Sequence, residues 1–264
     1  MHLEQQLTFL KRQIHVEVFR PEQPKRAVIL VHGFGDHLGR YVDSVIPVLQ
    51  DAGCAVVAYD HLGHGKTQGK RGYAPSYEAV LDLLDQVVRY ARQHFPDLPV
   101  MLYGHSMGGN IVLNYAMRRT QELCGVIATS PYLRLAFDPP AWKLKLGRLL
   151  LQLWPSFTLD SKLDPQAISR LPEEVARYQE DPLNHHEISP VYTFPVLDAG
   201  QWVLAHPDQL KVPTLLVHGT GDRITDHQAS IDLHQKSSKT TLHLIPGGIT
   251  NCIMTRIGMC FSSS

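Results

Sequence analysis

Short apolar runs alternate with helical patterns along most of the chain. Runs of consecutive apolar residues are typical of strands covered on both faces in a parallel sheet. They lie at Ala27–Val31, Ala55–Tyr59, Val100–Tyr103, Val126–Thr129, Thr214–Val217 and Thr241–Ile245, and Ile14–Phe19 alternates as a half-buried strand does. The helical patterns lie at Tyr41–Leu49, Tyr77–His94, Gly108–Arg118 and Asp226–Gln235. The alternation predicts an α/β fold with a mostly parallel central sheet flanked by helices.

The alternation is interrupted between Tyr132 and Leu210, where no clear strand pattern occurs, and it resumes at Pro213. A helical stretch between two strands of one continuing sheet is typical of a cap or lid and not of an independent domain. We therefore expect a core of residues 1–131 and 211–248, a helical cap over 132–210 and an atypical C-terminal tail over 249–264.

The composition is that of a globular protein, since 44% of the 264 residues are hydrophobic. Lys plus Arg and Asp plus Glu both number 25, and this balance argues against nucleic acid as a main partner. The N-terminus shows no signal-peptide pattern, and no run is long and apolar enough to cross a membrane. No pattern indicates a metal or cofactor. The four cysteines match no zinc or disulfide pattern and favour a reducing, cytoplasmic location: Cys54, Cys124, Cys252 and Cys260.

The segment from Gly104 to Gly108 follows an apolar strand and precedes a helix. Its Gly-x-Ser-x-Gly pattern in that context is typical of a nucleophile elbow. The turn requires strained backbone angles at the serine, and side chains at the two glycines would collide with the adjacent strand and helix. We expect Ser106 to be a catalytic nucleophile.

A nucleophile of this kind needs two backbone N–H donors to stabilise the oxyanion that it generates. One donor is expected from Met107, the residue after the nucleophile. The second comes from the loop after an early strand, and Val31–Gly35 fits because its glycines allow close backbone approach. Phe34 is the candidate second donor.

The acid of a serine hydrolase orients a histidine and stabilises its protonated form. Asp222 follows an apolar strand that ends in Gly219-Thr220-Gly221, so we expect Asp222 to be this acid. Asp226 is the nearby competitor, and we interpret it as a helix N-cap.

Three motifs together resemble the monoacylglycerol lipase and lysophospholipase branch of the α/β-hydrolases, which is serine aminopeptidase S33-like: His32–Tyr41, Asp60–Gly65 and Gly104–Gly109. Tyr178–Leu183 and Gly221–Arg223 also resemble it, and the match covers about residues 10–248. The resemblance implies an α/β-hydrolase fold with a helical cap. It also implies cleavage of a lipid ester, monoacylglycerol or lysophospholipid, through an acyl-enzyme on Ser106.

The resemblance further implies that Phe34 and Met107 are the oxyanion donors. Four more residues match positions that line or support the glycerol side of the family's pocket: Asp36, Arg40, His105 and Tyr178. Asp36 and Arg40 are also spaced to pair with each other.

Histidines elsewhere have simpler interpretations. We interpret His61 and His64 as bracing a loop, and His185 and His186 as solvated residues of the cap.

The expected base is missing from the sequence. In this fold the triad runs in the order Ser, acid, His, with the His in the loop after the last strand. The family places its His two residues after the glycine-containing turn that follows this strand. In this chain the turn is Pro246–Gly248, so the position is Thr250, and no histidine follows His243. His227 and His234 belong to the preceding helix. Threonine cannot act as the base at neutral pH, so we expect impaired activity or none.

Leucines crowd together with basic residues in Ala141–Trp154. The segment is either a helix that docks transiently on a membrane surface, where the protein would be peripheral, or an ordinary buried cap helix. Two functional alternatives also remain open. One is a peptidase or thioesterase on the same fold, and the other is a non-catalytic lipid-binding protein.

Overall fold

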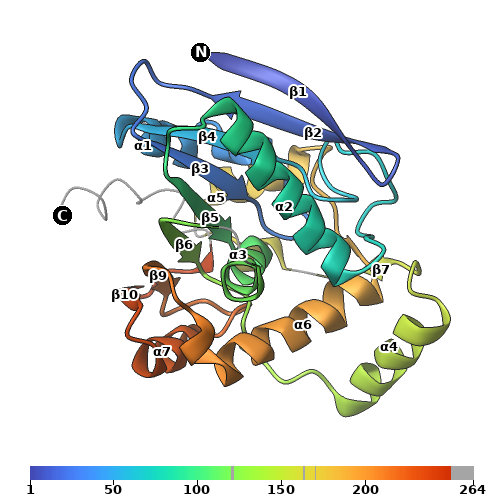
Figure 1. Ribbon diagram of the computed structural model, residues 1–264. Helices are drawn as coiled ribbons and strands as arrows, with labels where there is room; N and C mark the ends of the chain where they lie inside the picture. The colour runs from blue at the N-terminus through green and yellow to red at the C-terminus, as the bar shows by residue number, and fades with distance from the viewer. Residues whose placement is uncertain (120–121, 163, 170, 251–264) are drawn as a thin grey trace.

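An eight-stranded sheet forms the centre of the molecule in the computed structural model, which describes residues 1–119, 122–162, 164–169 and 171–250 (Figure 1). The sheet order is β1-β2-β4-β3-β5-β6-β9-β10, in which β1–β2 and β2–β4 are antiparallel and the other pairs are parallel. The strands are β1 (His2–Phe9), β2 (Arg12–Phe19), β3 (Arg26–Val31), β4 (Cys54–Tyr59), β5 (Val100–His105), β6 (Gly125–Thr129), β9 (Thr214–Gly219) and β10 (Thr240–Ile245).

Both faces of the sheet carry a hydrophobic core, because successive side chains of a strand point to opposite faces. Val28 and Leu30 of β3 pack with helix α1 (Val45–Asp51) on one face. Ile29 and Val31 pack on the other face, where the core includes residues of α2 (Tyr77–His94), α3 (Met107–Arg118) and α7 (His227–Lys236). This arrangement confirms the predicted α/β fold with a mostly parallel sheet.

The seven predicted strands are all present, but two N-terminal elements differ from the prediction. The pattern does not predict β1, an edge strand in which half-exposed and exposed residues alternate. The predicted helix Tyr41–Leu49 is instead a 3₁₀ turn, η1 (Leu38–Tyr41), followed by α1. The side chain of His37 caps the turn by accepting a hydrogen bond from the Gly39 N–H, so the helix proper starts later.

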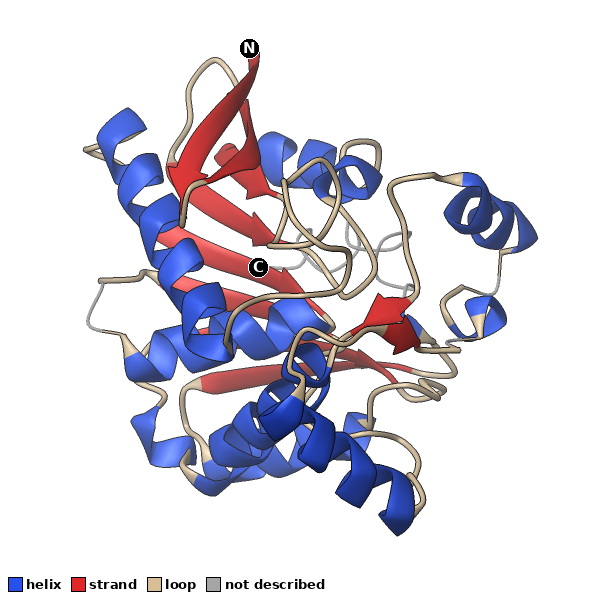
Figure 2. Cartoon of the chain, turned by 90° about the vertical axis from the view of Figure 1, so that its right-hand side faces the viewer, coloured by secondary structure: helices blue, strands red, loops and turns tan. Residues whose placement is uncertain are grey.

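The segment of residues 132–210 lies beyond the carboxyl ends of the parallel strands, where the small β7–β8 ribbon is seen in Figure 2. Its longest helix, α6, packs on α3: the Asn110 side chain donates to the carbonyl of Val196, and that of Asn114 to Ala199. The elements are α4 (Ala141–Leu153), β7 (Leu159–Asp160), η2 (Pro165–Ala167), α5 (Pro172–Glu180), β8 (Glu187–Ile188), α6 (Pro190–Ala205) and η3 (Pro207–Gln209).

Helix α4 stands at the edge of the molecule against α6 (Figure 1). Its Gly147 faces the ring of Phe194, and Arg148 pairs with Asp198 at 2.6 Å. None of its residues is buried, and Leu153 is 74% exposed. The interpretation as an ordinary buried helix is therefore wrong, because Trp142, Leu146, Leu149 and Leu153 of α4 are exposed and its other leucines are only partly buried. Among the described residues, no helix combines the length and apolar character needed to cross a membrane.

Candidate active site

Ser106 occupies a strained turn between β5 and α3. Its backbone has φ 54° and ψ −114°, a conformation that residues with a side chain rarely adopt. A Cβ at Gly104 would overlap the backbone of Gly108, and one at Gly108 would overlap the Val31 carbonyl of β3. Both glycines are therefore required for the serine to be presented above the sheet, as the sequence pattern predicts.

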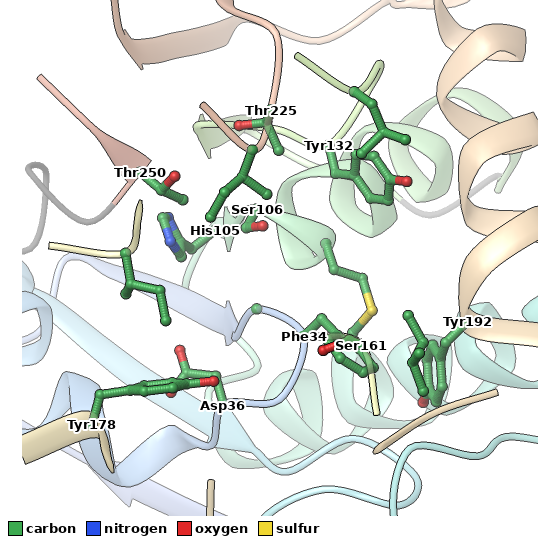
Figure 3. A pocket seen from close by; sticks show the side chains of 16 residues that line it. Phe34, Asp36, His105, Ser106, Tyr132, Ser161, Tyr178, Tyr192, Thr225 and Thr250 are labelled. Carbon is green, nitrogen blue, oxygen red and sulfur yellow. The ribbon is translucent and has the colours of Figure 1, made fainter. Parts of the chain in front are cut away.

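A cavity of about 160 Å³ opens in front of Ser106 (Figure 3). Its walls are mostly apolar or aromatic, and a few polar groups converge on them. The described residues that line it are Gly33, Phe34, Asp36, His105, Ser106, Met107, Tyr132, Leu135, Ser161, Ile168, Tyr178, Ile188, Tyr192, Ile224, Thr225 and Thr250. Six of the eight predicted site residues are in this set, whereas Arg40 and Asp222 are not.

The loop that carries Phe34 runs directly beside the nucleophile. A Cβ at Gly33 would lie 3.5 Å from Ser106 Cβ, an ordinary van der Waals distance, so Gly33 and Ser106 are direct neighbours. Met107 begins α3, and its N–H belongs to the first turn of that helix, whose N-terminal N–H groups lack intrahelical partners. Phe34 and Met107 thus flank Ser106 on the wall of the same cavity, an arrangement that suits stabilisation of an oxyanion.

The 132–210 segment contacts the loop that carries Phe34. The backbone N–H of His185 donates to the Gly35 carbonyl at 3.1 Å, and Gly35 has φ 66°. A side chain at Gly35 would overlap the His185 carbonyl oxygen. The loop and the residues around His185 are therefore joined through their backbones.

His185 is buried, with 7% of its surface exposed, so its interpretation as a solvated residue is wrong. Its ring packs 5.6 Å from the ring of Phe34 and 4.6 Å from that of His64. Burial lowers the pKa of His185 to about 4, so the ring is neutral near pH 7. The sequence misleads here because a His-His pair in a polar stretch gives no sign of the backbone contact with Gly35.

His61 and His64 have the bracing role expected from the sequence. The His61 N–H donates to His32 Nε2 at 3.0 Å, and His64 Nδ1 hydrogen-bonds the Leu62 carbonyl at 3.0 Å. All three rings are buried, and burial lowers the pKa of each. They hold the loop after β4 against the loop after β3.

One end of the cavity is polar. Asp36 accepts from the Tyr41 hydroxyl at 2.9 Å and pairs with Arg40 at 3.5 Å, as their spacing predicts. The Arg40 guanidinium lies 4.9 Å from the centre of the Tyr178 ring. Burial opposes the charge on Arg40, but Asp36 together with Tyr41, Tyr178 and Glu174 raises the pKa of the guanidinium. Arg40 therefore supports the wall formed by Asp36 and Tyr178 without lining the cavity itself.

His105 also lines the cavity, next to Ser106 in the chain. Its Nδ1 hydrogen-bonds the Thr129 hydroxyl at 2.9 Å, which ties the ring to β6.

Asp222 lies three residues after the end of β9, and its carboxylate is buried and accepts several hydrogen bonds. Oδ1 accepts from the N–H groups of Ile224 and Thr225, and Oδ2 accepts from the Thr225 hydroxyl at 2.9 Å. His218 Nε2 lies 3.6 Å from the same oxygen. Burial alone would raise the pKa of Asp222, but the neighbouring His218 and the N–H groups of Thr225 and Ile224 that donate to the carboxylate lower it. Thr225 separates this carboxylate from the cavity.

Asp226 caps α7, as expected from the sequence. Its side chain accepts a hydrogen bond from the Gln228 N–H, and it also pairs with Arg134 at 2.7 Å. These contacts account for the residue fully as a structural one.

Thr250 reaches the cavity from the loop after β10. Its carbonyl accepts from the Ser130 hydroxyl at 3.3 Å, and the residue is 5% exposed. Within the described part of the chain, the Thr250 hydroxyl is buried and has no hydrogen-bond partner. Most of the predicted tail, residues 251–264, lies outside the described residues.

The three histidines after Asp222 do not line the cavity. His234 and His243 are exposed, and the ring of His227, at the start of α7, lies 6.4 Å from that of His218 in β9. In the described ranges no group of side chains is arranged to hold a metal ion.

Several cavity residues have no signal in the sequence. Tyr132 follows β6, Tyr192 starts α6, and Thr225 lies three residues after the predicted acid. None belongs to a recognisable motif, because each enters the cavity through the packing of distant elements. The Tyr192 hydroxyl, for example, donates to the Leu62 carbonyl at 2.8 Å.

Comparison with known proteins supports the same family. The family described as "Serine aminopeptidase, S33" matches residues 22–249. The chain is 32% identical to a monoacylglycerol lipase of Mycolicibacterium smegmatis, over 85% of this chain and 83% of that protein. It is 33% identical to an uncharacterized abhydrolase domain-containing protein of Dictyostelium discoideum, over 89% of this chain but only 25% of that longer protein.

The fold comparison agrees. The crystal structure of the Paleococcus ferrophilus monoacylglycerol lipase superposes with a TM-score of 0.85 at 34% identity, covering 94% of this chain and 95% of that one. With the elbow at Ser106 and the mostly parallel sheet, these matches show that the chain belongs to the serine aminopeptidase S33 family of α/β-hydrolases, in its monoacylglycerol lipase-like branch.

Proposed function

We propose that the chain is a serine hydrolase scaffold for carboxylic esters of lipids, with monoacylglycerol or lysophospholipid as the substrate class. The observation that carries this proposal is Ser106 at positive φ, in a mostly apolar cavity between Phe34 and Met107. Relatives named monoacylglycerol lipase support the substrate class. Residues 132–210 are the cap of this scaffold, and we place the protein in the cytoplasm.

The two ends of the cavity suit the two halves of such a substrate. Leu135, Ile168, Ile188 and Ile224 offer an apolar surface to an acyl chain. Asp36 and Tyr178 offer hydrogen-bonding groups to a polyol or similar head group, with Arg40 behind them. No cofactor takes part in this proposal.

In the proposed reaction, Ser106 Oγ attacks the ester carbonyl carbon, and the N–H groups of Phe34 and Met107 stabilise the resulting oxyanion. The alcohol leaves with a proton, and water then hydrolyses the acyl-enzyme. Both steps need a base to accept a proton, and a threonine hydroxyl at position 250 cannot do so at neutral pH. Turnover is therefore slow.

Replacing the threonine tests the proposal directly. We expect Thr250→His to raise kcat/KM for a monoacylglycerol and a p-nitrophenyl ester by about 10³-fold, because loss of a triad member costs several orders of magnitude. We also expect it to speed labelling of Ser106 by a fluorophosphonate. Ser106→Ala in the same background is the matched control and should abolish both signals. If Thr250→His gains neither activity nor labelling, the proposal fails.

Thr250 itself favours a second candidate, a non-catalytic lipid-binding protein. Under this alternative the native chain retains a monoacylglycerol with micromolar or better affinity while Ser106 is not labelled. Hydrolysis of peptide or thioester substrates in preference to lipid esters would instead indicate a peptidase or thioesterase.

We also propose that α4 rests on a membrane surface and admits substrate from it. Its exposed residues combine large apolar side chains with the cations Lys143 and Lys145, and such helices bind anionic lipid interfaces. The exposed apolar residues are Trp142, Leu146, Leu149, Leu153 and the adjoining Trp154.

A triple variant, Leu146→Ser, Leu149→Ser and Leu153→Ser, tests this contact. We expect it to weaken binding to phosphatidylserine-containing vesicles by about tenfold or more, because less apolar surface enters the interface. The stability should change by less than about 0.5 kcal/mol per site, since these side chains are exposed. Leu10→Ser, 53% exposed at the β1–β2 turn, is the matched control and should bind as the native chain does. Equal binding by both variants would exclude α4 as the contact.

A further inference from the structure

The carboxyl ends of four neighbouring strands bring Ser106, Ser130, Asp222 and Thr250 to one edge of the sheet. Ser106 follows β5, Ser130 follows β6, Asp222 follows β9, and the loop with Thr250 follows β10. These strands are neighbours in the sheet order. The position of Thr250 beside the nucleophile is thus a consequence of topology.

Backbone contacts fix the main chain at Thr250 independently of its side chain. The Gly221 N–H donates to the Gly248 carbonyl at 2.8 Å, and the Gly247 N–H donates to the Thr220 hydroxyl at 2.8 Å. The Ser130 hydroxyl bonds the carbonyl of Thr250. A change of side chain at this position therefore leaves the loop in place.

Thr250 and Thr225 present polar groups to the part of the cavity next to Ser106 (Figure 3). Thr250 is only 5% exposed, and its buried hydroxyl lacks a hydrogen-bond partner among the described residues. A buried hydroxyl without a partner is costly, and it gains free energy when a ligand supplies one. The Thr225 hydroxyl donates to the buried carboxylate of Asp222, so its oxygen is the part that remains to accept from a ligand.

We propose that the cavity between Ser106 and Thr250 is a binding site for a small neutral heteroaromatic base of imidazole size, which activates Ser106. This inference rests on the proposed function, because it needs a serine nucleophile and its oxyanion donors. One ring nitrogen faces Ser106 and the other is held by the polar groups of Thr250 and Thr225. The short threonine side chain leaves more of the cavity to the ligand than a ring at this position would.

The chemical step is balanced without further reagents. As Ser106 Oγ forms a bond to the ester carbonyl carbon, its proton passes to the free ring nitrogen of the bound base. The imidazolium then returns that proton to the alkoxide of the leaving alcohol as the C–O bond breaks. A water molecule then attacks the acyl carbon while the same base takes its proton. The base returns that proton to Ser106 Oγ as the acyl C–O bond breaks and the carboxylic acid leaves.

The experiment measures p-nitrophenyl butyrate hydrolysis by the native chain as imidazole is increased at constant pH and ionic strength. We expect a saturable rise in kcat/KM of about 10²-fold, within the range of general-base catalysis. Ser106→Ala measures the reaction of imidazole with the ester in solution, which rises linearly and is subtracted. 2-Methylimidazole should act less well than imidazole because its methyl group occupies the confined space.

Blocking variants tie the effect to the site. Thr250→Leu and the bulkier Thr250→Phe should lose the imidazole response, and thermal melting identifies any variant that fails to fold. If at least one folded variant keeps the full response, the inference is overturned. A response that is linear, or equal in Ser106→Ala, also overturns it.

The closing comparison separates this inference from the proposed function. If Thr250→His is active while the native chain ignores imidazole, the base site is wrong and the hydrolase scaffold stands. If Thr250→His is also inactive and unlabelled by a fluorophosphonate, the proposed function fails and this inference fails with it.

Discussion

The two halves of the cavity differ in the chemical groups that their side chains supply. The nucleophile half, built from β3, β5 and α3, combines a strained Ser106 with Phe34 and Met107, all set by backbone geometry. The base half, built from β9 and β10, has equally specific backbone contacts at Gly221 and Gly248. Its side chains Thr225 and Thr250 line the cavity with hydroxyl-bearing residues, whereas the proposed function needs a proton acceptor there.

Under the proposed function, this difference separates the backbone frame of an active site from its acid–base chemistry. The close glycine contacts of the nucleophile half depend on the main chain and allow almost no substitution. The proton acceptor depends on one side chain, and a hydroxyl there leaves the surrounding loop intact. A fold can therefore keep the geometry of catalysis while losing most of its rate.

The largest expected effect concerns the glycines of the two halves. A Cβ at Gly108 would overlap the Val31 carbonyl, and that backbone cannot move without disturbing β3. We expect Gly108→Ala to lower the free energy of unfolding by about 4 kcal/mol or more. Gly221→Ala places its Cβ 3.0 Å from the Gly247 carbonyl oxygen, and about 1 kcal/mol is expected. Urea unfolding of both variants measures the contrast, and equal losses would contradict it.

An intermediate effect concerns pH and the buried ring behind Phe34. Because burial lowers the pKa of His185 from 6.5 to about 4, the folded state favours the neutral ring. Its contribution to stability is complete above pH 6.5 and is lost as the pH falls through about 4. We expect His185→Asn to remove about 3 kcal/mol of the acid-induced loss between these pH values.

The measurement is urea unfolding at a series of pH values. His186→Asn, the partly exposed neighbour, is the control and should retain the native pH profile. If His185→Asn shows the same pH dependence of the free energy of unfolding as the native chain, protonation of the His185 ring does not contribute to the loss of stability in acid.

The smallest effect compares two buried threonines of the base half. Thr225→Val removes a hydroxyl that donates to buried Asp222, so we expect a loss of about 1–3 kcal/mol. Thr250→Val removes a hydroxyl that lacks a partner in the described part of the chain, so the free energy of unfolding should stay the same or rise by up to about 1 kcal/mol. Thermal unfolding of both isosteric variants measures the two changes in stability. A large loss in Thr250→Val would reveal a bonded hydroxyl.

The sequence predicts the parallel strands and the elbow well, because their patterns come from local constraints. Continuous apolar runs such as Ala55–Tyr59 arise only where both faces of a strand are covered, and Gly104 and Gly108 are needed by the turn itself. The N-cap role of Asp226 is likewise local. Each of these features depends on neighbours close in the chain or on burial alone.

The sequence fails where long-range packing decides. His185 is buried because its backbone meets Gly35, some 150 positions earlier, and nothing near it in the chain signals this. The same holds for Tyr192 and Thr225 in the cavity wall. Helix α4 packs on α6 through Gly147, which faces Phe194, and this contact determines which apolar residues of α4 are exposed. The apolar pattern of a helix shows which residues share one of its faces, but not which segment, if any, packs against that face.

The backbone bond between His185 and Gly35 has a mechanical consequence. The 132–210 segment is fastened to the rest of the molecule at residues 135–136, which meet Ile224 and Thr225, and again at residues 185–189, which meet Gly35 and Gly72. Between these attachments Lys70 donates to the Ser156 carbonyl and Asp181 pairs with His37 at 2.8 Å, whereas α4 packs against α6 and none of its residues is buried. Under the proposed function, α4 can therefore move while the loop that carries Phe34 stays joined to the residues around His185. Access to the cavity and alignment of the proposed oxyanion donors then depend on different parts of the segment.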